Sequence, residues 1–246
     1  MTDTLVHTRR RFLSSFAVTC GSAALVRGSS PLPRLALERD SSDQEDKKNR
    51  AEEEVGPAED LMREHGVLRR ILLIYREAIR RTAARQQVPA EPLSRAATLV
   101  RRFVEDYHEK LEEEQVFPRF RKSNNLVPLV NVLYEQHQKG RILTGTILKL
   151  ATPAFVKDPA ELSKLSESLS RFIRMYEPHA AREDTVLFPA FRKIVSSREL
   201  DQLGDQFEKK ENELFGQEGF EKNVEEVANL ERDFGIYNLS DFTPKI

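Results

Sequence analysis

Four stretches of the chain place their apolar residues on one side of a helix, with prolines and polar turns between them. In the first stretch the apolar positions follow alternating steps of four and three residues, as expected for a helix that buries one stripe. Residues 87–92 contain two prolines and end this stretch, and Asp158 followed by Pro159 provides an N-terminal cap for the fourth. The pattern predicts an all-α fold with helices at 58–86, 93–122, 127–151 and 160–195.

Histidines occupy the apolar stripes of these helices. The chain has five histidines, and all except His7 fall one per predicted helix. These four are His65, His108, His137 and His179. Glu112 and Glu183 follow the second and fourth of them by four residues, so each Glu shares a helix face with its His at a Cβ separation of about 5–6 Å. Each such pair has the geometry to chelate a cation.

The site motif occurs twice. His65 and His137 are 72 residues apart, and His108 and His179 are 71 apart. A Phe-Pro pair follows each glutamate by five residues, at Phe117-Pro118 and Phe188-Pro189. This period is typical of a duplicated helical hairpin, and two hairpins make a four-helix bundle.

Taken singly, each histidine is best interpreted as a hydrogen-bonded core residue, but together they favour a metal site. Two buried carboxylates are costly unless they are paired or bind metal. With Cys20 as the only cysteine, the imidazole and carboxylate donors suit iron, manganese or zinc, and six donors exceed what one tetrahedral zinc uses. We therefore expect two ions bridged by the glutamates. If both are octahedral, about two positions stay open for a diatomic molecule or peroxide.

These residues and the two Phe-Pro pairs resemble the hemerythrin-like (HHE cation-binding) family over residues 57–195. The resemblance implies an up-down-up-down four-helix bundle with a non-haem di-iron centre that interacts with oxygen, nitric oxide or peroxide. Iron is favoured over manganese or zinc. The family's six common ligands would be His65, His108, Glu112, His137, His179 and Glu183.

The chain departs from oxygen-carrying hemerythrins at two places. Arg141 stands where those proteins have a further histidine, and they end with an aspartate at a longer spacing than that of His179 to Glu183. The resemblance therefore implies a more open centre, suited to redox chemistry or sensing rather than oxygen transport. Glu109, Glu113 or Asp184 could supply the missing ligand, although each alone reads as a solvated acidic helix edge.

Alternatives to a binding or sensing module remain open. The centre could belong to an enzyme that decomposes peroxide or nitric oxide, or its ions could only stabilise a scaffold. Iron-sulfur cluster repair proteins share the ligand pattern, but they usually carry a cysteine-containing N-terminal module.

Charge and the ends of the chain complete the prediction. Lys and Arg number 39 against 40 Asp and Glu, so no basic field argues for nucleic acid. Residues 1–37, with Arg9-Arg10 ahead of Phe12-Leu13 and an apolar stretch, resemble a twin-arginine signal and predict export across the cytoplasmic membrane, with no stable membrane span in the mature chain. A charged linker follows at 38–56, and 196–246 is expected to form a C-terminal helical extension with helices near 198–215 and 220–230.

Overall fold

The computed structural model describes residues 55–245, which are helical with short connections and contain no strand. The predicted export signal lies outside the described residues, as does nearly all of the predicted linker. The described residues from Gly56 onward form one compact unit.

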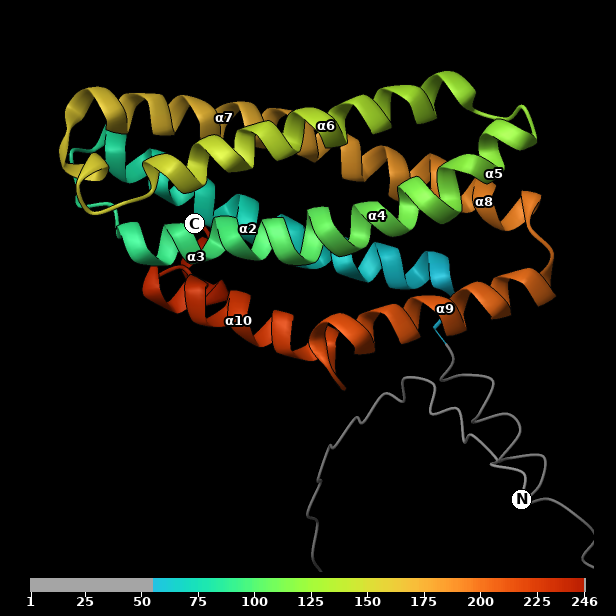
Figure 1. The fold of residues 1–246 in the computed structure, drawn as a ribbon. Helices are drawn as coiled ribbons and strands as arrows, with labels where there is room; N and C mark the ends of the chain where they lie inside the picture. Colours follow the sequence, from blue (N-terminus) through green and yellow to red (C-terminus); the bar gives the residue numbers. More distant parts are fainter. Residues whose placement is uncertain (1–54, 246) are drawn as a thin grey trace, which may run out of the picture. The chain divides into compact units, whose positions relative to one another are not determined.

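Four long helices form the bundle (Figure 1). The first is α2 (Pro57–Ala83), and the third is α6 (Val127–Leu150). The second runs without a break through α3 (Ala90–Leu99), η1 (Val100–His108), α4 (Glu109–Leu111), η2 (Glu112–Val116) and α5 (Phe117–Lys122). The fourth runs through α7 (Pro159–Arg182), η4 (Glu183–Leu187) and α8 (Phe188–Ile194).

Each long helix packs against its neighbours in sequence, and α2 also packs against α7 to close the ring. The connections are short, so successive helices run in opposite directions. This is the up-down-up-down bundle that the sequence predicts, with helix ends within a few residues of the expected ones. Asp158 caps α7 as expected, because its Oδ1 accepts a hydrogen bond of 2.8 Å from the amide of Ala160.

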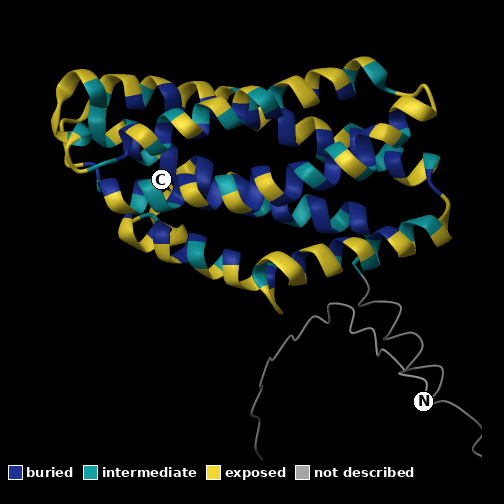
Figure 2. Ribbon diagram, viewed as in Figure 1, coloured by how far each residue is buried: buried dark blue, intermediate teal, exposed yellow. Residues whose placement is uncertain are grey.

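The bundle buries its apolar stripes around a core that is rich in aromatic side chains (Figure 2). Among the fully buried side chains are the following residues: Tyr75, Phe103, Tyr107, Phe117, Phe120, Phe172, Tyr176, Phe188 and Phe191. Burying aromatic side chains contributes more per residue than burying small aliphatic ones, so this core supplies much of the driving force for folding. It also surrounds the polar residues at the centre of the bundle with a dry environment.

The helices that carry the two glutamates contain π-helical turns. Turn η2 begins at Glu112 and ends just before Phe117-Pro118, and turn η4 repeats this arrangement from Glu183 to Phe188-Pro189. A proline cannot donate a backbone hydrogen bond, and a turn with i→i+5 bonding absorbs the missing donor. The helix is therefore locally wider at the same place in both halves.

The C-terminal extension forms two helices, α9 (Ser197–Phe215) and α10 (Gly219–Asp233), and a short 3-10 turn at Leu239–Phe242. Both helices contact α2, and α10 also contacts α3. Arg70 on α2 forms two hydrogen bonds with the Glu231 carboxylate on α10, at 2.9 and 2.6 Å. None of the helices in 55–245 is both long and apolar enough to cross a membrane.

Candidate metal centre

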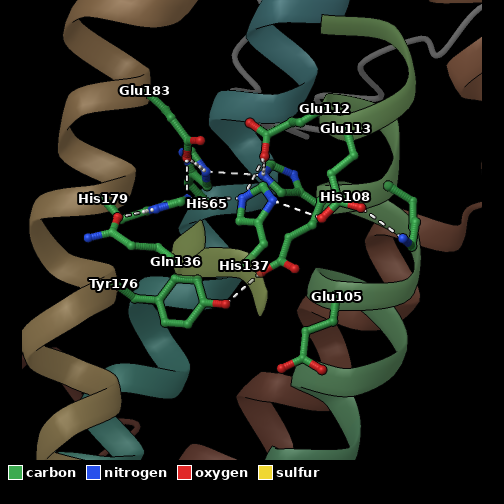
Figure 3. Close-up of polar contacts among 12 residues, drawn as sticks. His65, Glu105, His108, Glu112, Glu113, Gln136, His137, Tyr176, His179 and Glu183 are labelled. Atoms are coloured by element: carbon green, nitrogen blue, oxygen red, sulfur yellow. Dashed lines mark hydrogen bonds and ion pairs between the residues drawn. The ribbon is translucent and has the colours of Figure 1, made fainter. Parts of the chain in front are cut away.

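The six predicted ligands lie together in the middle of the bundle (Figure 3). One histidine comes from each long helix, and the two glutamates come from the first residues of the π-helical turns. All six residues are buried, with exposed fractions of at most 3%. The structure therefore brings together every residue singled out from the repeat.

The histidines form two pairs, one from each hairpin. The Nε2 atoms of His65 and His108 are 3.1 Å apart, and those of His137 and His179 are 3.2 Å apart. Two imidazole nitrogens bound at about 2.1 Å to one ion, at a right angle to each other, lie about 3.0 Å apart. Each pair therefore matches the spacing of two ligands of a common ion.

The glutamates lie between the two pairs. One Glu112 oxygen is 3.7 Å from Nε2 of His108 and 3.4 Å from Nε2 of His137. One Glu183 oxygen is 3.3 Å from Nε2 of His65 and 3.0 Å from Nε2 of His179. Each carboxylate thus faces one histidine from each hairpin, which is the placement that a bridging ligand requires.

The other ring nitrogen of each histidine meets an oxygen atom. Nδ1 of His65 lies 2.7 Å from Asp184, and Nδ1 of His108 lies 2.8 Å from Glu64. In the second hairpin, Nδ1 of His137 lies 3.2 Å from Glu113, and Nδ1 of His179 lies 2.8 Å from Oε1 of Gln136. Each Nδ1 atom can donate to its oxygen, which makes Nε2 the nitrogen available to a metal ion at the centre.

A cation fits the resulting arrangement. The carboxylates of Glu112 and Glu183 are buried, and among the described residues they have no lysine, arginine or hydroxyl partner; their oxygens face the Nε2 atoms of the histidines. Two carboxylates in a dry interior repel each other unless a positive charge lies between them. The donor set of imidazoles and carboxylates suits iron, manganese or zinc.

Comparison with known proteins gives the same result. The model of the hemerythrin HHE cation-binding domain matches residues 56–191, which cover the four long helices except the last three residues of α8, and matches again over 130–234. The chain belongs to the hemerythrin HHE cation-binding family. The second match starts 74 residues after the first, close to the 71–72-residue period of the ligands.

Among the curated relatives of this HHE-domain chain are uncharacterized proteins of Mycobacterium tuberculosis and Mycobacterium bovis. Each is 44% identical over 238 residues, covering 96% of this chain and 91% of the relative. No solved structure matches the chain significantly.

Without a cation in this HHE-domain centre, burial and neighbouring charges shift the pKa values of its residues in opposite directions. Burial and the nearby Glu183 raise the pKa of Glu112 well above its usual range. Burial acts on Glu183 in the same direction, but His179 and His65 outweigh it and hold the pKa of Glu183 well below its usual range. Burial alone would lower the pKa of His65, yet hydrogen bonds with Asp184 and Glu183 raise it to about 9. A metal ion binding there would displace protons.

The three acidic residues considered as extra ligands have other partners. Glu109 accepts a hydrogen bond of 2.6 Å from the hydroxyl of Tyr176, and Arg141 pairs with Glu109 at 2.9 Å and with Glu113 at 2.7 Å. Glu113 and Asp184 hold the Nδ1 atoms of His137 and His65. The expectation of a solvated acidic edge was therefore wrong: Glu109 is only 1% exposed, and all three residues contribute to the surroundings of the ligands.

The two Phe-Pro pairs place aromatic rings against ligands in the opposite hairpin. Phe117 stacks on His137 with ring centroids 5.4 Å apart, and Phe188 stacks on His65 at 5.7 Å. Both phenylalanines are fully buried. They fix the planes of two imidazoles and keep water from that side of the HHE centre.

Sequence reasoning missed two partners, Glu64 and Gln136. Each stands immediately before a histidine on the first or third helix and holds the histidine of the following helix. The repeat contained this signal, because the two positions are 72 residues apart. Tyr107, beside His108, donates a hydrogen bond of 3.1 Å to Glu64.

Proposed function

We propose that this protein holds two non-haem iron ions and that the centre interacts with oxygen, nitric oxide or peroxide. Membership of the HHE family supports cation binding. The observation that carries the finer proposal is the pair of buried carboxylates that lie between two pairs of histidine Nε2 atoms and have no lysine, arginine or hydroxyl partner among the described residues. His65 and His108 would hold one ion, His137 and His179 the other, and Glu112 and Glu183 would bridge them. The ions would supply redox electrons and open positions for a small ligand.

The choice of iron follows from the donors. Four neutral imidazoles and two carboxylates, with no thiolate, match the ligands used by non-haem iron, and manganese and zinc are the alternatives. Around them the chain provides oxygens that hold each Nδ1 proton and aromatic rings that exclude water. These features orient the histidines so that Nε2 faces the centre.

The surroundings favour reaction or sensing over reversible oxygen transport. Arg141 lies one turn after His137, where oxygen carriers have another ligand, and its guanidinium pairs with Glu109 and Glu113. A cation cannot donate electrons to a metal ion, so this position contributes no ligand. The centre thereby has one nitrogen ligand fewer, which favours positions accessible to small reactive molecules.

Metal analysis tests the proposal. We expect purified full-length protein to contain about two iron ions per chain. Glu112→Gln should reduce the iron content, whereas the matched change Glu114→Gln, on an exposed residue of the same helix, should leave it unchanged. A single tetrahedral zinc, or equal iron content in both variants, would refute a centre of this kind.

Decomposition of peroxide or nitric oxide is the second candidate, favoured by the same missing nitrogen ligand. Adding peroxide to the iron-loaded protein separates the possibilities. Sustained turnover would show an enzyme, and a reversible spectral change without turnover would show a binding or sensing protein. No response to peroxide, oxygen or nitric oxide, with iron still bound, would indicate a metal-stabilised scaffold.

A further inference from the structure

The two halves of the centre differ in one of the oxygen atoms that contact a histidine Nδ1 atom. Three of the four Nδ1 atoms face a carboxylate, and the fourth, that of His179, faces the neutral amide of Gln136. In the repeat, Gln136 stands where the first half has Glu64. The four ligating histidines are otherwise related by the repeat, so this difference distinguishes the two metal positions.

The carboxylate of Glu64, which contacts His108, is buried and accepts two hydrogen bonds. Glu64 accepts hydrogen bonds from Nδ1 of His108 at 2.8 Å and from the hydroxyl of Tyr107 at 3.1 Å, and its side chain is 1% exposed. Within residues 55–245, no lysine or arginine forms an ion pair with it. Its negative charge therefore acts on the His108 imidazole with little screening. Gln136 is only partly buried and carries no charge.

Neighbouring cations increase the difference. In the second half the only carboxylate on an Nδ1 atom, Glu113, is neutralised by Lys110 and Arg141, each at 2.7 Å. In the first half Arg69 pairs with Asp184, while no lysine or arginine among the described residues pairs with Glu64. The surroundings of His65 and His108 are thus more negative than those of His137 and His179.

A carboxylate on Nδ1 makes an imidazole a more basic ligand, and losing such a partner typically lowers metal affinity by about 10–100-fold. We infer that the two metal positions are unequal, and that the ion on His65 and His108 is bound more tightly than the ion on His137 and His179 because Gln136 replaces a glutamate. Glu64 and Gln136 are positioning residues, since each acts through a histidine. This inference rests on the proposed two-metal centre.

The experiment titrates metal-depleted, full-length protein with ferrous iron without oxygen, against a competing chelator, and records the affinity of each step. Two ions in one centre repel each other, so two separate binding steps in the wild type do not show that the two metal positions differ in affinity. Variants of each position test this difference. Glu64→Gln should weaken the tighter step by about 10–100-fold, and Gln136→Glu should strengthen the weaker step by a similar factor. His179→Ala should remove the weaker step and leave the tighter one.

Matched controls change the same net charge away from the centre. Glu135→Gln, on an exposed residue beside Gln136, is the control for Glu64→Gln, and Asn131→Asp on the same helix is the control for Gln136→Glu. Neither control should move either step by more than about twofold, because exposed charges are screened. Circular dichroism of the metal-free variants checks that they fold, and Gln136→Glu decides alone if Glu64→Gln does not.

The outcomes separate the two proposals. Wild-type protein that binds fewer than two ions would refute the two-metal centre itself. Two ions with steps that Gln136→Glu leaves unchanged, or a Glu64→Gln effect confined to the weaker step, would refute the inequality and leave the two-metal centre standing.

Discussion

Replacing Gly140 by alanine should destabilise the protein, although alanine is the better helix former. Gly140 lies in the middle of α6, and a Cβ atom built on it would be 1.9 Å from the hydroxyl oxygen of Tyr176 and 2.8 Å from its Cζ atom. Tyr176 is fully buried and donates a 2.6 Å hydrogen bond to Glu109. The methyl group and this ring position cannot coexist, so the tyrosine must move.

The expected magnitude combines three effects. Overpacking a rigid core costs about 1–3 kcal/mol. Losing the Tyr176 hydrogen bond to a buried carboxylate costs about 1.5–3 kcal/mol. The helix propensity of alanine returns about 1 kcal/mol. We therefore expect the free energy of unfolding to fall by about 2–5 kcal/mol.

Urea unfolding followed by circular dichroism measures this change, with Gly66→Ala as the matched control. Gly66 also lies inside a helix beside a ligand, but a Cβ there meets nothing within 4 Å, so the control should be stabilised by about 1 kcal/mol. Adding Tyr176→Phe to Gly140→Ala removes the closest clashing atom and should recover part of the loss. A Gly140→Ala protein as stable as the Gly66→Ala control would refute the assigned packing.

Four further predictions concern the centre and the N-terminus. Removing the metal with a chelator should lower the melting temperature, because ligand binding energy is also folding energy, and calorimetry with and without iron measures the shift. The folded-state pKa of His65, about 9, is above its ordinary 6.5, so protonation of His65 stabilises the metal-free protein by about 3 kcal/mol below pH 6.5. This contribution is lost as the pH rises through 9. In a profile of stability against pH measured by urea unfolding, Asp184→Asn should flatten this part of the curve. Phe188→Ala should cost about 3–5 kcal/mol of unfolding free energy and loosen iron binding measured by chelator competition, whereas an unchanged affinity would show that the ring does not orient the ligand. Changing Arg9 and Arg10 to lysine should keep the protein in the cytoplasm, as cell fractionation would show; unchanged export would contradict the proposed twin-arginine signal.

The sequence predicted the helices and the six central residues because both follow from simple periodicity. A histidine in an apolar stripe and a glutamate one turn later need only the helical repeat to be placed on a common face. The partners of Nδ1 could not be found in this way. Glu113 and Asp184 look like surface residues of one helix until a second helix places a histidine against them, and the same holds for Glu64 and Gln136. The π-helical turns η2 and η4 depend on how each helix adapts locally to the proline that follows, which no hydrophobic pattern records.

Each hairpin of the bundle is incomplete without the other. Glu113 and Phe117 of the first hairpin hold His137 of the second, and Asp184 and Phe188 of the second hold His65 of the first. A chain of half this length could assemble such a centre only as a symmetric dimer, and that dimer would dissociate at low concentration. Joining the halves through residues 123–126 turns that encounter into an intramolecular one, with an effective concentration of the order of millimolar. Joined in one chain, the halves could also diverge: a substitution such as Gln136 alters one half alone, whereas in a dimer of identical subunits it would alter both.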